Sequence, residues 1–328
     1  MNIIKDRRKI NHAIRKAKII FLMAHKNLDL DALGSCIGMS KLLKKRRKNV
    51  YIIIDDKTHE PGVEKVLKEL DGCIDIIDGN NIDEYKSPKE SKNLLIILDT
   101  NKKELVQNDK VLKKISKKLI IDHHELGKTT IKDAIIINDK KTSSTCEMIT
   151  NLIEHYDIEI DSYYATILLA GIVLDTNNYT LNTSAETFYT SYYLTSLGAS
   201  AKKVQYLLKQ NIEEYTERQK LLSEIETING KIAFTKASPN TQYRREDLAK
   251  VADTLLFFNN IEASFVIGKI GKNIVGISAR SLGSYNILKI LNKLGGGGDS
   301  TGGAASFENT TISKVEQELK KIIKETGE

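Results

Sequence analysis

Short apolar runs rich in β-branched residues alternate with helix-like stretches throughout the first half of the chain. Runs of this length and composition are typical of strands buried on both faces of a sheet. Helix-like stretches at 32–45 and 64–70 lie between several of them, and this alternation favours a mainly parallel sheet flanked by helices. We therefore expect an α/β domain whose strands cover 19–24, 50–54, 94–98, 119–121 and 135–137.

The second half has a different pattern, and a chain of 328 residues is long enough for two domains. From residue 142 to about residue 228 the sequence predicts nearly continuous helix, including a buried helix at 161–174. A smaller α+β domain is expected beyond it, because apolar runs at 263–270 and 273–279 can form a hairpin. The expected divisions are a main domain at 1–200, a helical connector at 201–228 and a second domain at 229–328.

Composition excludes several classes of protein. The chain has only three prolines, and this low number argues against a disordered chain. Its three cysteines are scattered, which excludes a disulfide scaffold and favours a reducing compartment. The net charge of +7 suits an anionic ligand without requiring one. The basic stretch 41–48 is typical of a solvated helix end, with attraction of nucleic acid as the alternative.

Nothing in the sequence predicts a membrane segment. The amino terminus is polar and charged, so it lacks the apolar core of a secretory signal. The longest apolar run, 163–174, is too short for a membrane span, which needs about 20 residues. We therefore expect a cytoplasmic protein without a membrane partner.

Acids and histidines gather where several of the predicted elements end. Each such segment alone is also typical of a helix cap or a surface loop. The carboxyl ends of parallel strands meet at one edge of a sheet, so together they favour a site for two divalent cations about 3.5–4 Å apart, such as manganese. The residues are His25, Asp29, Asp31, Asp99, Asp122, His123, His124 and Asp175.

The order of these residues resembles a known family. The series His-x-x-x-Asp-x-Asp-x-x-Gly-Ser, Asp-Thr, Asp-His-His and Asp-Thr is similar to that of the DHH phosphoesterases. Residues 278–281 and the glycine run 295–298 resemble the DHH-associated domain that accompanies them. The segments around 25–39, 169–183 and 277–286 are most similar to the cyclic-di-AMP phosphodiesterase branch. The resemblance implies the catalytic module of that branch without its membrane helices and sensory domains.

The resemblance implies two manganese ions that share one carboxylate, with magnesium or cobalt left open. Asp122 would orient the neighbouring imidazole, and His124 would act on the scissile phosphate as a hydrogen-bond donor or general acid. The ligands of one ion would be His25, Asp29 and Asp99, and those of the other Asp31, Asp99, His123 and Asp175.

The second domain would bind the substrate phosphate. Asp299 departs from the family pattern, which has a histidine there, and a carboxylate would repel phosphate unless it is protonated or paired. The residues implied in substrate binding are Arg280, Ser281, Gly296, Gly297, Gly298 and Asp299.

The function implied is a manganese-dependent phosphodiesterase that hydrolyses cyclic di-AMP to pApA by attack of metal-bound hydroxide, with further cleavage to AMP left open. One alternative is an oligoribonuclease or 3′-phosphoadenosine-5′-phosphate phosphatase of the same superfamily. The other, motivated by Asp299, is a nucleotide-binding protein that has lost catalysis. The expected partner is a small nucleotide and no long nucleic acid, with a homodimer left open.

Overall fold

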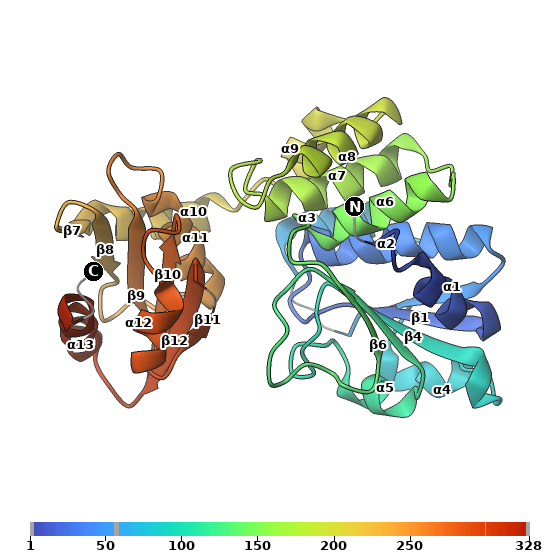
Figure 1. Ribbon diagram of the computed structural model, residues 1–328, viewed down its shortest axis with the longest axis horizontal. Helices are drawn as coiled ribbons and strands as arrows, with labels where there is room; N and C mark the ends of the chain where they lie inside the picture. Colours follow the sequence, from blue (N-terminus) through green and yellow to red (C-terminus); the bar gives the residue numbers. More distant parts are fainter. Residues whose placement is uncertain (1–2, 56–58, 299, 326–328) are drawn as a thin grey trace. The chain divides into compact units, whose positions relative to one another are not determined.

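The computed structural model describes residues 3–55, 59–298 and 300–325 and divides into two compact units, Met1–Lys209 and Gln210–Glu328 (Figure 1). Asp299, the residue that departs from the family pattern, lies outside the described residues.

The stretch 201–228, predicted as one helical connector, is interrupted at the point where the chain divides. Helix α9 (Ala201–Leu207) belongs to the first unit, and α10 (Ile212–Leu221) belongs to the second. Asn211 starts a new helix, because its side chain accepts the first free amides of α10. The stretch ends in a strand, β7 (Glu226–Ile228), where helix was expected.

The first unit contains a six-stranded parallel sheet in the order β3-β2-β1-β4-β5-β6. Five of its strands lie where the apolar runs predicted them, and the two-residue β3 was not expected. The strands are β1 (Ile19–Met23), β2 (Asn49–Ile53), β3 (Ile76–Ile77), β4 (Asn93–Leu98), β5 (Lys118–Asp122) and β6 (Ile135–Asn138).

Helices cover both faces of this sheet. Alternate strand residues point to opposite sides, so Ile20 and Leu22 enter the larger core, whereas Phe21 and Met23 enter the smaller one. The longer helices lie on the larger-core side, and α4 and α5 lie on the other (Figure 1). The helices not yet given are α1 (Arg7–Lys16), α2 (Leu30–Lys45), α3 (Pro61–Glu69), α4 (Ile82–Tyr85), α5 (Asp109–Lys114), α6 (Thr145–His155), α7 (Ser162–Asp175) and α8 (Ala185–Ser196).

The second unit contains a mixed six-stranded sheet in the order β11-β12-β10-β9-β8-β7. Strand β12 was not predicted, because its sequence GGAASFE has no β-branched residue. The α/β domain followed by an α+β unit confirms the predicted fold class. The remaining elements are β8 (Ile232–Lys236), α11 (Arg245–Leu255), β9 (Ala263–Gly271), β10 (Ile274–Ser281), α12 (Ile287–Lys293), β11 (Gly297–Gly298), β12 (Gly302–Glu308) and α13 (Ile312–Glu325).

Among the described residues, no helix has both the length and the apolar character needed to cross a bilayer. The most apolar long helix, α7, has 14 residues and is buried in the first unit.

Close packing of α7 on α2 positions the beginning of α2. A β-carbon at Gly171 would lie 2.6 Å from Cys146 Sγ, 2.9 Å from Asp31 Cα and 3.0 Å from the carbonyl oxygen of Leu30. Only glycine permits this approach. The first turn of α2 therefore lies directly against α6 and α7.

Gly171→Ala should lower the free energy of unfolding by about 1–3 kcal/mol, because the added methyl group meets backbone atoms as well as a side chain. The matched control is Gly127→Ala, where an added β-carbon meets nothing within 4 Å and the expected change is within about 0.5 kcal/mol. Urea unfolding followed by circular dichroism measures both. Equal stability of the two variants would contradict the close packing.

Candidate metal centre

The segment from the end of β1 to the first turn of α2 supplies three of the predicted ligands. Asp29 is the N-cap of α2, where its Oδ1 accepts the amide of Ala32 at 2.9 Å. Its other oxygen lies 3.7 Å from His25 Nε2. The helix-cap and metal-ligand interpretations of this segment are therefore compatible, because the two oxygens of one carboxylate serve different contacts. Asp31, in the first turn of α2, is fully buried.

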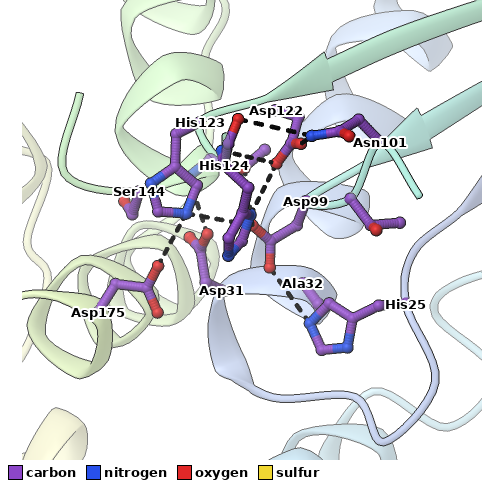
Figure 2. A network of polar contacts seen from close by, with 12 residues as sticks. His25, Asp31, Ala32, Asp99, Asn101, Asp122, His123, His124, Ser144 and Asp175 are labelled. Carbon is purple, nitrogen blue, oxygen red and sulfur yellow. Dashed lines mark hydrogen bonds and ion pairs between the residues drawn. The ribbon is translucent and has the colours of Figure 1, made fainter. Parts of the chain in front are cut away.

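Asp99 lies between the other acids and histidines. It directly follows β4 with a backbone φ of 59°, a left-handed conformation that is strained for a residue with a side chain. One carboxylate oxygen lies 3.3 Å from His25 Nε2, and the other lies 3.4 Å from His123 Nε2. Figure 2 shows the two imidazoles approaching this carboxylate from different segments of the chain.

Asp175, the last residue of α7, completes the cluster. Its Oδ2 lies 3.1 Å from His123 Nε2 (Figure 2). Three groups of side chains that share Asp99 each place their potential ligand atoms within 4.8 Å of one another. One of them is Asp99, His123 and His124, and the other two match the predicted ligand sets. The first of these two is His25, Asp29 and Asp99, and the second is Asp31, Asp99, His123 and Asp175.

Burial and crowding shift the pKa values of the acids in opposite directions. Burial raises the pKa of Asp31 well above its ordinary value, and the charges of Asp99 and Asp175 add to that shift. Burial likewise raises the pKa of Asp175 to about 6, although His123 opposes it. For Asp99, the nearby imidazoles of His123 and His25 outweigh burial and hold its pKa well below the ordinary range.

The histidines respond to the same crowding. Burial disfavours their charged forms, but the carboxylates nearby raise the pKa values of both His25 and His123 well above the ordinary value. Asp29 and Asp99 act on the first, and Asp175 and Asp99 on the second. Several buried carboxylates so close together need positive charge, which either protons or metal cations can provide.

One buried atom tests whether a cation suits the site. His123 Nε2 has no hydrogen-bond partner of acceptable geometry, although oxygens of Asp99 and Asp175 lie within 3.4 Å of it. A buried ring nitrogen without a hydrogen bond is costly unless something else uses its lone pair. The carboxylates of Asp31, Asp99 and Asp175 surround it, and this donor set of imidazole and oxygen fits a divalent ion such as manganese.

Asp122 orients His124 rather than the ligand candidate His123. Its Oδ1 accepts from His124 Nδ1 at 2.8 Å and from the His124 amide at 3.2 Å. Asn101 Nδ2 donates to its Oδ2 at 2.5 Å (Figure 2). Burial opposes protonation of His124, but Asp122 raises its pKa above the ordinary value. The His124 imidazole is half exposed, and Asp122 fixes its orientation through Nδ1. Its Nε2 is therefore left for another partner.

The structure adds residues that the sequence analysis missed. The amides of Thr145 and Cys146, at the start of α6, donate to the two oxygens of Asp31 at 2.8 and 2.7 Å. The hydroxyl of Thr145 donates to Asp99 at 2.9 Å. The serine cap before α6 was visible in the sequence, but no local signal linked this helix start to acids more than 40 residues away.

The predicted substrate-binding residues lie in the second unit. Arg280 Nε donates to Asp253 at 2.8 Å, and its side chain packs over Gly302. The Ser281 hydroxyl is buried and accepts from the amides of Gly283 and Tyr285, so it stabilises a turn.

The glycine run is not simply a flexible loop. Gly297 and Gly298 form β11, which pairs with β12. A β-carbon on Gly298, whose φ is 150°, would overlap the carbonyl oxygen of Gly302. The glycine run therefore allows the backbones of β11 and β12 to approach closely, and β12 lies next to β10, the strand that contains Arg280.

Family models match both units. The model of the DHH family N-terminal domain matches residues 19–172, and that of the DHHA1 domain matches residues 229–327. A cyclic-di-AMP phosphodiesterase, GdpP, of Geobacillus thermodenitrificans is 35% identical over 324 residues, which are 96% of this chain and 49% of that protein. The chain therefore spans about half the length of that relative.

Two further similar proteins match this chain over most of their own length. The bifunctional oligoribonuclease and PAP phosphatase NrnA of Thermus thermophilus is 24% identical, over 93% of this chain and 89% of that protein. The crystal structure of an exopolyphosphatase-related protein from Bacteroides fragilis superposes with a TM-score of 0.77 and 21% identity, covering 98% of this chain and 97% of that one. That similarity shows the fold alone. The ordered histidines and acids, the two family models and the 35% identity give one conclusion: the chain belongs to the DHH phosphoesterase family and carries a DHHA1 domain in its second unit.

Proposed function

We propose that the chain is a divalent-metal-dependent phosphodiesterase that hydrolyses cyclic di-AMP to pApA. The observation that carries the proposal is the pair of ligand groups that share Asp99. The 35% identity to a protein named cyclic-di-AMP phosphodiesterase supports this choice of substrate.

Two manganese ions fit the proposed ligands, with His25, Asp29 and Asp99 around one and the second group of the cluster around the other. Ions bound there would supply an acidic water as nucleophile and neutralise charge on the phosphoryl oxygens. The protein's own contribution is to fix the carboxylates. Asp31 is held by two amides of α6 and Asp99 by the Thr145 hydroxyl, so neither has to reorganise during the reaction.

His124 is the proposed proton donor to the leaving oxygen. Asp122 raises its pKa, which favours the protonated ring, and the bond from Nδ1 to Asp122 fixes the ring orientation. Asn101 in turn holds the second oxygen of Asp122. Arg280, kept in place by Asp253, is the proposed phosphate contact of the DHHA1 domain.

The second candidate is hydrolysis of short linear oligoribonucleotides or of 3′-phosphoadenosine-5′-phosphate. The match to NrnA favours it, because that match covers 89% of the relative, although at 24% identity.

Parallel assays with manganese and equal concentrations of cyclic di-AMP, pApA and 3′-phosphoadenosine-5′-phosphate distinguish the two candidates. We expect the highest kcat/KM for cyclic di-AMP. Asp99→Ala should abolish turnover of every substrate, because the shared ligand is lost, and it serves as the control for contaminating nucleases. Faster turnover of either linear substrate by the unaltered protein would favour the second candidate.

Manganese binding should displace protons. Nearby carboxylates raise the pKa values of His25 and His123 well above the ordinary value, so these imidazoles favour their protonated forms in the metal-free site and the apparent affinity should rise with pH. Titration calorimetry in buffers of different ionisation enthalpy should detect release of at least about one proton per chain at pH 7. Binding without proton release would contradict the proposed ligands.

His124→Ala should lower kcat by about 10²- to 10⁴-fold through loss of the proton donor. Manganese stoichiometry, measured by elemental analysis after dialysis, should remain that of the unaltered protein. His123→Ala is the matched variant, and it should lose metal as well as activity. Loss of metal from the His124 variant would instead identify His124 as a ligand, since its ring also lies near Asp99.

A further inference from the structure

The edge of the parallel sheet opposite the metal centre carries a concentration of positive charge. Helix α1 ends there, α2 ends there, and the strands begin there. We call eight cationic residues at these ends the basic edge. They are Arg15, Lys16, Lys18, Arg46, Arg47, Lys48, Lys92 and Lys117.

Strand register aligns three of these lysines. Residues 49, 19 and 93 are lateral partners in neighbouring parallel strands, so Lys48, Lys18 and Lys92 precede them in one row. The backbone bonds from Asn49 N to the Lys18 carbonyl and from Lys18 N to the Lys92 carbonyl continue the ladder through this row. At about 4.8 Å between strands, the row spans roughly 10 Å.

Hydrogen bonds connect the segments of two further residues of the basic edge, Arg15 and Lys117, to this row. Lys48 Nζ donates to the carbonyls of Arg15 and Ala17 at the end of α1, and Lys117 Nζ donates to the Ser91 carbonyl beside Lys92. Burial, and then the charges of Lys92 and Arg46, lower the pKa of Lys48. Lys92 and Arg46 are therefore close enough to Lys48 to repel its charge.

The cations of the basic edge have no acidic side chains paired with them among the described residues. Within the described ranges, none of the eight residues forms an ion pair, whereas Lys44 and Lys45 just before them pair with Asp75 and Glu159. Glu90, near Lys92 in the chain, instead accepts from the amide and hydroxyl of Ser116 and from Asn93. Clustered unpaired cations cost stability, and an anionic partner would remove that cost.

We infer that the basic edge binds the anionic headgroup surface of a lipid bilayer. Some of the cations lie along the row where the strands begin, and others lie at the ends of α1 and α2, which cover one face of the sheet. The cations therefore extend in two directions, and such an arrangement suits a flat anionic surface. None of the exposed large apolar or aromatic side chains of the described residues belongs to these segments, so single-stranded nucleic acid would find no stacking surface. The sequence analysis predicted no membrane partner because it found no segment able to span a bilayer, and this inference departs from that prediction.

Binding in this way gives the first unit an orientation. The strands run from the basic edge toward the metal centre, because the proposed ligands follow their carboxyl ends. A bilayer on the basic edge therefore leaves the metal centre on the side that faces water, open to small substrates. The attraction is electrostatic and reversible, with each cation near the surface contributing a comparable share.

Sedimentation with vesicles tests the inference on the whole chain. Vesicles with one part phosphatidylglycerol to two parts phosphatidylcholine should bind the protein at about 0.05 M salt, and pure phosphatidylcholine vesicles should not. The variant Lys16→Glu/Lys18→Glu/Arg47→Glu, in which all three side chains are exposed and donate no described bond, should bind at least about 100-fold more weakly. Raising the salt to about 0.5 M should release the unaltered protein.

The matched control is Lys202→Glu/Lys272→Glu/Lys314→Glu, which changes the net charge equally through exposed lysines elsewhere. It should keep most of the binding. Equal loss in both triple variants would reduce the effect to net charge and overturn the inference, as would absence of binding to the anionic vesicles at low salt. Preference for an RNA duplex over vesicles of equal charge would assign the basic edge to nucleic acid instead.

Discussion

The arrangement of the first unit depends on the Asp99 carboxylate. It is almost completely buried, it follows β4 in a strained backbone conformation, and imidazoles from two other segments approach its two oxygens. A carboxylate in such a place is stable only with positive charge around it. The other residues of the cluster can meet this need in two ways. The histidines can carry protons, or the histidines and carboxylates together can bind cations.

Helix packing supplies the rigidity that such a cluster needs. Asp31 is fixed by the amides that begin α6, where the helix dipole favours a negative charge. The beginning of α2 also lies close against α7, and Gly171 permits that approach. The buried helix α7 therefore has two roles, because it fills the core and ends in Asp175 at the cluster. Core packing and the proposed chemistry are not separable here.

The two edges of the same sheet have opposite electrostatic character. Acids collect where the strands end, and unpaired cations collect where they begin. Parallel topology produces this separation, because every strand contributes its first residues to one edge and its last residues to the other. A small anionic substrate and an extended anionic surface could then be bound at the same time without competing for the same residues.

The sequence by itself determined the fold class and the family, and it predicted the members of the cluster that the structure brings together. Apolar runs at 94–98 and 119–121 identified the strands, and the ordered series from His25 to Asp175 identified the family, because both signals are local or depend only on order. The tertiary structure alone decided that Asp122 contacts His124 and that Thr145 reaches Asp99. It also decided that Lys18, Lys48 and Lys92 form one row. These contacts join residues whose separation in the chain carries no periodic signal, and only the register of the strands and the packing of the helices bring them together.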